Sequence, residues 1–243
     1  MGAPLFLLPE LPSGPRYRLD GPEGHHAANV QRLQRGEQLL LGDGIGGMAR
    51  CEVTRVAKGA LDVAVLQRWG EPEPEVRLTV VQAIAKGDRG ELAVQAMTEV
   101  GVDTVVPWAA ARSVARWKDE RGEKSLRRWR SAAREAGKQA RRAWQPVVAE
   151  PMDTKAVRQL LETATAAYVL HEEATQPLAS VDLPTDGEIQ LVVGPEGGIA
   201  PAELDLFVVA GAVPVRLGSS VLRTSTAGVA ALAVVSARTG RWS

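Results

Sequence analysis

The sequence predicts an α/β protein whose mostly parallel sheet follows a small N-terminal β-barrel. Beyond residue 76, apolar segments rich in β-branched residues alternate with segments of helical periodicity, a pattern typical of a parallel sheet covered by helices. Before residue 72, short apolar segments are separated by glycine-containing turns, which is typical of a small barrel. The charged, proline-containing segment 71–75 indicates a linker. We therefore expect two domains, residues 1–72 and residues 76–243.

The N-terminal domain is expected to hold strands over residues 38–41, 49–56 and 61–66. Glycines at 43–47 and 58–59 lie between these strands. They favour tight turns, because glycine adopts positive φ without steric cost.

Six strands are expected in the C-terminal domain, and the first two flank a helix. Asp88 begins that helix, with Glu91 in the spacing of a capping box, and Gly101 ends it. The expected strands cover residues 78–85, 102–108, 147–149, 166–170, 189–193 and 213–217.

Residues 124–142 are predicted to form a long helix with two faces. The apolar face is expected to carry Leu126, Trp129, Ala133, Ala136 and Ala140. The basic face is expected to carry Arg127, Arg130, Arg134, Lys138 and Arg141.

Charge is unevenly distributed along the chain. The formal net charge is zero, yet residues 112–144 contain twelve Lys and Arg against four Asp and Glu. A basic helix is often only a solvated face, but this one has Trp108, Trp117, Trp129 and Trp144 in or beside it. Basic residues interleaved with aromatic residues favour RNA, whose phosphates and unstacked bases are bound together.

Composition excludes several classes of protein. The only cysteine, Cys51, is expected to be a buried or half-buried thiol, and it permits neither an intrachain disulfide nor a multi-cysteine zinc site. His25 and His26 have no spaced carboxylate or cysteine partner, so we expect a structural role and no metal. No apolar run reaches the roughly 20 residues that span a bilayer, and residues 5–8 are too short for a signal-peptide core. A cytoplasmic protein without membrane contact is expected.

Two glycine-containing loops follow predicted strands near the C-terminus. The first, Gly194-Pro-Glu-Gly-Gly198, lies between an apolar strand and a helix that begins near Pro201. It fits neither the phosphate loop of nucleotide hydrolases nor the dinucleotide fingerprint. The second loop, after Leu217, precedes a buried helix over 227–237 that Thr224, Ser225 or Thr226 could cap. A single loop of this kind could be a structural turn, but two at one edge of a parallel sheet indicate a ligand site.

Together, Gly194-Pro-Glu-Gly-Gly198 and Leu217-Gly-x-x-Val-Leu-Arg-Thr-x-Thr-Ala227 resemble the RsmE-type family of 16S rRNA uracil-N3 methyltransferases. The resemblance extends to the segment around His25, Val30 and Arg32 and to the one from Glu135 to Pro146. It implies a knotted methyltransferase domain of the SPOUT class behind a PUA-like RNA-binding barrel. It also implies S-adenosylmethionine as cofactor, 16S rRNA or the small ribosomal subunit as partner, and a homodimer.

The resemblance also assigns roles to residues. Arg223 and Glu196 are the candidate catalytic residues. The cofactor is expected to contact Leu170, His171, Val193, Gly194, Glu196, Gly197, Gly198, Leu217, Gly218, Val221, Leu222 and Thr224. The RNA is expected to contact Arg32, Arg112, Arg127, Arg130, Arg134, Lys138 and Arg142.

Some alternatives stay open at this point. The first domain opens with apolar rather than basic residues, and Ser225 stands where many members of the family carry Glu. A related knotted methyltransferase acting on tRNA or on a ribose hydroxyl is therefore a second interpretation. A noncatalytic ribosome-assembly factor is a third, which the intact glycine loops disfavour. The base that removes the N3 proton could be a carboxylate or a histidine.

Overall fold

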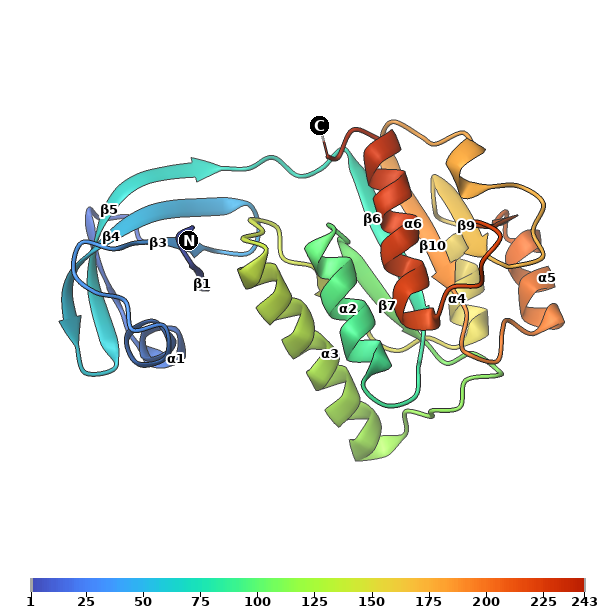
Figure 1. Ribbon diagram of the computed structural model, residues 1–243, viewed down its shortest axis with the longest axis horizontal. Coiled ribbons are helices and arrows are strands. Elements are labelled where there is room, and N and C mark those ends of the chain that lie inside the picture. The colour runs from blue at the N-terminus through green and yellow to red at the C-terminus, as the bar shows by residue number, and fades with distance from the viewer. Residues whose placement is uncertain (1, 243) are drawn as a thin grey trace. The chain divides into compact units, whose positions relative to one another are not determined.

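A computed structural model describes residues 2–242, which divide into two compact units (Figure 1). One unit takes the chain up to Glu73 together with Gly137–Gln145, and the other takes Pro74–Ala136 and the chain from Pro146 onward. The first division point lies within the linker that the sequence predicts, 71–75. The return of residues 137–145 to the first unit has no counterpart in the sequence pattern.

The first unit is built on a five-stranded sheet in the order β1-β3-β4-β5-β2. β3 (Gln38–Gly42), β4 (Gly47–Ala57) and β5 (Ala60–Gly70) form an antiparallel meander that contains the three predicted strands. β1 (Leu5–Leu7) adds to β3 in parallel, and β2 (Arg16–Leu19) adds to β5 antiparallel. Neither of these two strands is predicted by the sequence pattern, because each is only three or four residues long.

A short helical segment packs on this sheet. α1 (Gly21–His25) continues directly into the π-helical turn η1 (His26–Val30), and Ala27 is buried with Phe6, Leu39 and Leu41 in the unit's core. Cys51 belongs to the same core, where burial raises the pKa of its thiol to about 11. The expectation of a buried or half-buried thiol is therefore confirmed.

The second unit contains a six-stranded sheet in the order β11-β9-β10-β6-β7-β8, and every neighbouring pair is parallel. All six predicted strands are present. Their bounds are β6 (Val76–Ala83), β7 (Thr104–Trp108), β8 (Val147–Val148), β9 (Ala166–Leu170), β10 (Gly187–Val193) and β11 (Val213–Val215).

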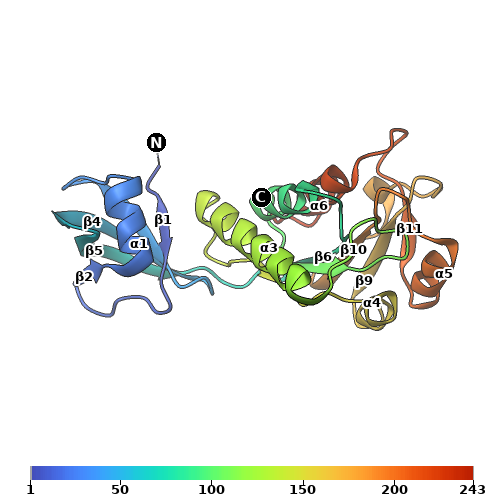
Figure 2. The same cartoon turned by 90° about the horizontal axis from the view of Figure 1, so that it is seen from below.

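Helices cover both faces of this sheet, as Figure 2 shows. α2 (Arg89–Glu99), α3 (Asp119–Gln139) and α6 (Thr224–Arg238) pack on one face, and α4 (Thr154–Leu161) and α5 (Pro201–Val209) pack on the other. Side chains of β6 alternate between the two cores, with Leu78 and Val80 on one face and Val81 and Ala83 on the other. A parallel sheet buried on both faces explains why its strands are continuous apolar runs.

The long basic helix differs from its prediction at both ends. α3 begins five residues earlier than expected, at Asp119, and ends at Gln139. Its end is a Schellman motif: the amide of Arg142 donates to the Gly137 carbonyl, and that of Arg141 donates to the Lys138 carbonyl. Arg141 takes a positive φ of 53° there. Ala140 therefore lies beyond the helix and is exposed, contrary to the prediction that it faces inward.

Lys138 was expected on the basic face, and this prediction is wrong. Its side chain is only 6% exposed, and its Nζ lies 3.1 Å from Glu23 Oε2 and 3.2 Å from Oε1. A buried ammonium needs such a counter-charge, because desolvation of an isolated charge is costly. The predicted inward residues Leu126, Trp129, Ala133 and Ala136 are all buried.

α4 is a helix that the sequence pattern did not predict. The Asp153 side chain accepts a hydrogen bond from the Ala156 amide at 2.8 Å, the N-cap interaction that begins a helix. An Asp before the apolar spacing of Val157 and Leu161 was the available signal. No helix within residues 2–242 is long and apolar enough to cross a membrane.

Candidate functional site

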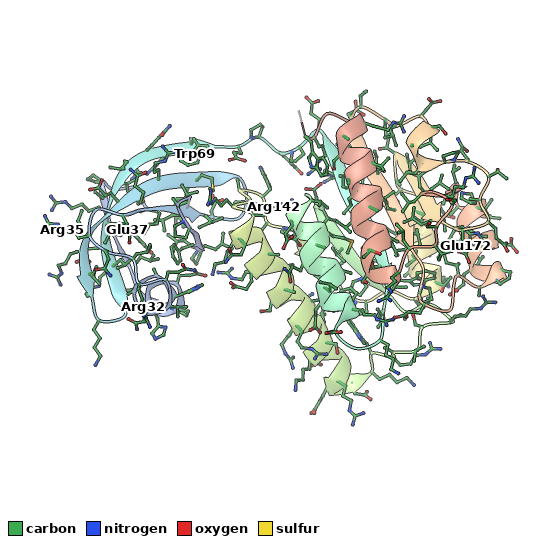
Figure 3. The ribbon with its side chains drawn as sticks, viewed as in Figure 1. Arg32, Arg35, Glu37, Trp69, Arg142 and Glu172 are labelled. Carbon is green, nitrogen blue, oxygen red and sulfur yellow. The ribbon has the colours of Figure 1, made fainter. Side chains whose placement is uncertain are left out.

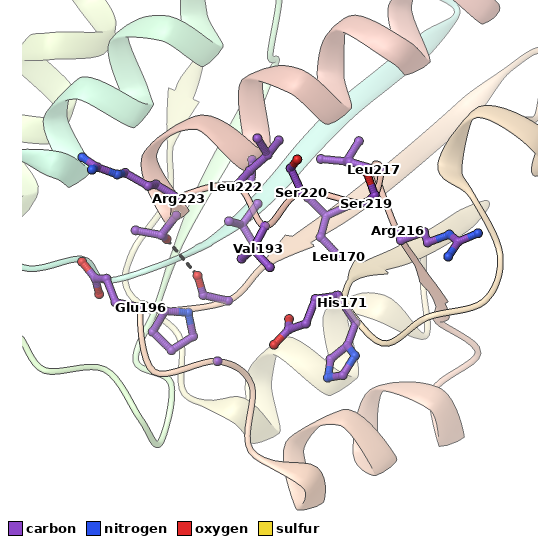
Figure 4. A pocket seen from close by; sticks show the side chains of 18 of the residues that line it. Leu170, His171, Val193, Glu196, Arg216, Leu217, Ser219, Ser220, Leu222 and Arg223 are labelled. Carbon is purple, nitrogen blue, oxygen red and sulfur yellow. Dashed lines mark hydrogen bonds between the residues drawn. The ribbon is translucent and has the colours of Figure 1, made fainter.

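A pocket of about 500 Å³ lies at the carboxyl ends of β9, β10 and β11 (Figure 4). The three loops that follow these strands form its walls, and the first turn of α6 completes it. Ligands of open α/β sheets bind at this edge, because all the strand-to-helix loops of a parallel sheet emerge there. The pocket lies entirely in the second unit.

The structure brings eleven of the twelve predicted cofactor-binding residues to this pocket, together with both candidate catalytic residues. The shared members are Leu170, His171, Val193, Gly194, Glu196, Gly198, Leu217, Gly218, Val221, Leu222, Thr224 and Arg223. Residues that line the pocket but were not predicted are Arg89, Glu172, Pro195, Arg216, Ser219, Ser220 and Ala227.

Gly197 is the predicted residue that does not line the pocket. It faces Arg112, whose Nη1 donates to the Gly197 carbonyl at 3.3 Å. A Cβ built on Gly197 would lie 3.3 Å from the Cβ and the carbonyl oxygen of Arg112. The glycine therefore permits close packing between two protein segments rather than the approach of a ligand.

The turn of the first loop depends on its other two glycines. Gly198 has a φ of +72°, and its amide donates to the Pro195 carbonyl at 2.9 Å. A Cβ on Gly194 would lie 2.7 Å from Cγ1 of Ile199, so the loop folds directly back on itself there. These contacts explain the glycines at both ends of the motif.

Thr224 joins this loop to the first turn of α6. Its hydroxyl donates to the Gly194 carbonyl at 2.8 Å and accepts from Nε2 of Gln82 at 3.0 Å. Gln82 is fully buried near the end of β6. Thr224, Ser225 and Thr226 were the residues expected to cap the helix, but the N-cap is Arg223 and no side chain caps it. The Thr224 hydroxyl bonds the loop instead.

The α5 helix is anchored on the far side of the same loop. Glu203 is buried, and its Oε1 accepts from the Ala111 amide at 2.8 Å and from the Thr154 hydroxyl at 2.7 Å. Its Oε2 accepts from the Ala200 amide at 3.2 Å. The carboxylate thus connects α5 to α4 and to the segment after β7, which fixes where the glycine loop ends.

Glu196 is oriented by two donors. The Lys86 amide donates to its Oε1 at 3.3 Å, and the guanidinium of Arg89 lies 3.5 Å from the same oxygen. These residues belong to the loop after β6 and the start of α2. The hydrogen bond from a backbone amide gives Glu196 a structural role beside its candidate catalytic one. Sequence spacing does not reveal Arg89, because it lies over a hundred residues away in the chain.

Arg223 and His171 lie on different sides of the pocket. Figure 4 shows Arg223 on the same side as Glu196, with His171 and Arg216 opposite. The Arg223 side chain has no hydrogen bond or ion pair to any residue within 2–242. Nδ1 of His171 accepts from the Glu173 amide at 3.3 Å. The Arg216 side chain likewise has no hydrogen bond or ion pair to any residue that the structure describes, so Arg223 is the available cation on the side of Glu196 and Arg216 the one on the opposite side.

The predicted RNA-binding residues are distributed over both units. Arg127, Arg130 and Arg134 lie exposed on the part of α3 that belongs to the second unit, whereas Arg32 and Arg142 belong to the first. Arg130 donates to the Val148 carbonyl at 3.1 Å and pairs with Glu150 at 2.7 Å, so its position is fixed by protein contacts. Arg127 pairs with Glu123 of the preceding turn, with 3.4 Å between Nη1 and Oε2, and both side chains are exposed. Within residues 2–242, no group of three or more His, Cys, Asp and Glu side chains could hold a metal ion.

Comparisons with known proteins agree with this geometry. Residues 72–236 match the family model of an RNA methyltransferase domain, and residues 19–66 match that of an RNA methyltransferase PUA domain. The chain is 48% identical to ribosomal RNA small subunit methyltransferase E of Mycobacterium bovis, over 100% of this chain and 94% of the relative. It is 29% identical to the protein of that name from Bacillus subtilis, over 95% and 93% of the two chains.

Solved structures give the same result. The crystal structure of ribosomal RNA small subunit methyltransferase E from Neisseria gonorrhoeae, bound to S-adenosyl methionine, superposes with a TM-score of 0.85 at 28% identity, covering 98% of each chain. A methyltransferase from Legionella pneumophila in complex with the same cofactor gives 0.86 at 27% identity, again covering 98% of each. The chain therefore belongs to the family of ribosomal RNA small subunit methyltransferase E proteins.

Proposed function

We propose that this protein transfers the methyl group of S-adenosylmethionine to N3 of a uridine in the 16S rRNA of the small ribosomal subunit. The observation that carries the proposal is the pocket at the ends of β9, β10 and β11, which gathers the family's two loop motifs around one cavity. Relatives that superpose on the whole chain bind this cofactor.

In this proposal, the three loops hold the cofactor largely through backbone groups. The segments after Leu170, Val193 and Leu217 supply amides and carbonyls, and the apolar side chains of Val221 and Leu222 cover the ligand. Val221 is 77% exposed, which is unusual for a large apolar side chain at the mouth of a pocket. When bound, the cofactor supplies a methyl group on a sulfonium that is already an activated leaving group.

In this proposal, protein side chains stabilise the negative charge that develops on the uracil and accept its N3 proton. N3 of uracil loses a proton as it is methylated, and the Arg223 guanidinium stabilises the developing anion. Oε1 of Glu196 is occupied by Lys86 and Arg89, so the carboxylate is oriented and Oε2 accepts the proton. N3 lies on the Watson–Crick edge, so the uridine must be unpaired before it can react.

The other interpretations account for less. A tRNA or ribose methyltransferase would share the cofactor loops, but the full-length relatives carry the small-subunit rRNA name. A noncatalytic assembly factor would not need an open pocket with an oriented carboxylate and an unpaired arginine. Calorimetry with S-adenosylmethionine separates this last interpretation from an enzyme.

The wider organisation belongs to the same proposal. We assign a PUA-like RNA-binding domain to residues 1–72 and the methyltransferase domain, which supplies further RNA contacts, to residues 76–243, with the knotted chain path that the family resemblance implies. A protein that modifies the small subunit works where ribosomes assemble, and we therefore propose a cytoplasmic location. Arg32, Arg112, Arg127, Arg130, Arg134 and Arg142 are the proposed RNA contacts, and Lys138 is excluded by its burial.

Filling the pocket should abolish activity without unfolding the protein. Gly218 lines the pocket, its φ is not positive, and a Cβ built there has nothing within 4 Å. We expect Gly218→Leu to weaken S-adenosylmethionine binding at least about tenfold, or about 1.4 kcal/mol, as measured by calorimetry. Formation of 3-methyluridine in small ribosomal subunits, measured by nucleoside mass spectrometry, should fall in parallel.

Gly70→Leu is the matched control for this experiment. Gly70 lies at the end of β5 in the first unit, also without positive φ and with nothing within 4 Å of a built Cβ. It should retain cofactor affinity. Wild-type affinity in folded Gly218→Leu would place the cofactor elsewhere, and wild-type protein that binds the cofactor but makes no 3-methyluridine would refute the proposed reaction.

The exposed arginines of α3 should determine the salt dependence of RNA binding. We expect the double variant Arg127→Gln with Arg134→Gln to lower the slope of log K against log salt by about 0.7 for each phosphate that it no longer neutralises. Lys155→Gln with Arg158→Gln, on α4 across the sheet, removes the same charge and should leave the slope unchanged. The binding constants are measured by fluorescence anisotropy. If the salt dependence of RNA binding is the same for both double variants, the basic face of α3 is a solvated surface that does not contact RNA phosphates.

We also propose that the protein is a homodimer through α6. One side of this helix is buried in the unit, and Val229 and Val234 pack partly against the same core. Ala230 and Ala233 are also apolar and only partly buried. Small side chains permit close packing of a symmetric partner. Light scattering should give twice 25.9 kDa for the wild type and one chain for Ala230→Glu. The exposed control Ala140→Glu should remain paired, and a monomeric wild type that still methylates RNA would overturn the dimer.

A further inference from the structure

A second cavity, of about 620 Å³, lies wholly within the first unit. Three stretches of chain line it: residues 2–6, which lead into and begin β1, the segment from His26 to the start of β3, and the C-terminal end of α3 with Arg141 just beyond it. Figure 3 labels Arg32 and Glu37, which line this cavity, and Arg35, which does not. Methyl transfer at the cofactor pocket makes no use of this cavity.

Two arginines of this cavity have strained backbones. Arg32 has a φ of 56° and Arg141 a φ of 53°, and only one other non-glycine residue within 2–242, Asp119, has a positive φ. Each arginine ends a helical segment, the position where glycine is usual because it has no Cβ. Strain of this kind persists where the side chain has a function that a glycine could not supply.

The charges of these two arginines are not balanced by the protein. Neither side chain makes a hydrogen bond or ion pair with any residue that the structure describes. Lys138, which also lines the cavity, is neutralised by Glu23. Glu37 carries the one carboxylate among the described lining residues, and its Oε2 accepts a hydrogen bond from the backbone amide of Gln34 at 2.6 Å. The cavity lining therefore carries two unpaired positive charges, and its one carboxylate is already hydrogen-bonded. This excess of positive charge attracts an anion.

The remaining polar groups of the cavity suit a nucleobase. Gln31, Gln34, Gln38 and Gln139 line it, and a side-chain amide can both donate and accept. Nε2 of Gln34 already donates to the Arg32 carbonyl at 2.8 Å, which leaves its oxygen and its second N–H for a ligand. A volume of this size is within the range of small-molecule pockets. Unpaired bases of RNA are recognised through hydrogen bonds to their edges, and their phosphates through arginine.

We propose that this cavity binds one unpaired nucleotide of the RNA substrate, with its phosphate held by Arg32 and Arg141 and its base edge contacted by the glutamine amides. The proposal rests on the proposed function for the identity of the RNA. The nucleotide is distinct from the uridine that is methylated, because the cavity belongs to the first unit and the cofactor pocket to the second.

Asparagine variants test the cavity without disturbing its backbone. Asn tolerates positive φ better than most residues, so Arg32→Asn with Arg141→Asn removes both charges and keeps both turns. With small ribosomal subunits from a deletion strain as substrate, KM should rise at least tenfold while kcat stays within twofold. Affinity for S-adenosylmethionine should be unchanged, and Tm should be equal or higher because strain is relieved.

Arg35→Asn is the matched control, since it removes a like charge from an exposed side chain of the same unit outside the cavity. It should leave KM within twofold of the wild type. An unchanged KM in the double variant, or an equal rise in KM for Arg35→Asn, would overturn the proposal. If the wild type itself methylates no RNA, the proposed function fails, and a direct titration with nucleotides still tests the cavity.

That titration adds uridine 5′-monophosphate, uridine or inorganic phosphate to the full-length protein and follows side-chain amide resonances by NMR. The monophosphate should shift the resonances of the lining glutamines and should bind more tightly than either fragment. The shifts should disappear in Arg32→Asn with Arg141→Asn. Equal binding of inorganic phosphate and the monophosphate would show a general anion site and overturn recognition of a nucleotide.

Discussion

The hydroxyl group of Thr224 is the interaction on which the site depends. It donates to the Gly194 carbonyl and accepts from the buried Gln82 amide, so it connects β6, the loop after β10 and the first turn of α6. These three elements are far apart in the sequence. Leaving a buried polar group without its partner costs about 1–3 kcal/mol, so the three elements hold each other in one arrangement. The shape of the pocket follows from that arrangement.

The remaining chemistry of the site follows from where charges are fixed and where they are not. The Glu203 carboxylate accepts hydrogen bonds from the Ala111 amide and the Thr154 hydroxyl. The Glu196 carboxylate accepts one from the Lys86 amide and lies beside the Arg89 guanidinium. These contacts fix the position of the glycine loop from two sides. Arg223, in contrast, is fixed only through its backbone, as the N-cap residue of α6. A rigid loop with a cation available at its edge suits a reaction in which negative charge develops on the substrate.

Sequence patterns predicted the second unit well, because its strands are buried on both faces and are bounded by glycine and proline. β9 was predicted to the residue, and the pocket was located because loops of a parallel sheet emerge at one edge. The first unit was predicted less completely. β1 and β2 are too short for a periodic signal, and the return of residues 137–145 is determined by tertiary contacts such as that between Lys138 and Glu23.

Single-residue predictions failed where a side chain's partner lies far away in the chain. Gly197 lies in sequence between residues that line the cofactor pocket, yet it packs against Arg112 instead. Lys138 has the spacing of an exposed basic face, yet it is buried against Glu23. Arg141 occupies a position where glycine is usual, which spacing alone does not reveal because a helix end is not visible in a basic run. For Gly197 and Lys138, the missing information is a contact between distant segments.

The most direct test is the cofactor affinity of Thr224→Val, measured by calorimetry beside Thr224→Ser. Valine keeps the shape of threonine but removes the hydroxyl, so the Gly194 carbonyl loses its side-chain donor. Nε2 of Gln82 keeps only its longer bonds, of 3.3 Å, to the carbonyls of Ala83 and Thr224. We predict that folded Thr224→Val binds S-adenosylmethionine at least about tenfold more weakly, whereas Thr224→Ser remains close to the wild type. Wild-type affinity in Thr224→Val would show that this hydroxyl does not hold the pocket in its binding shape.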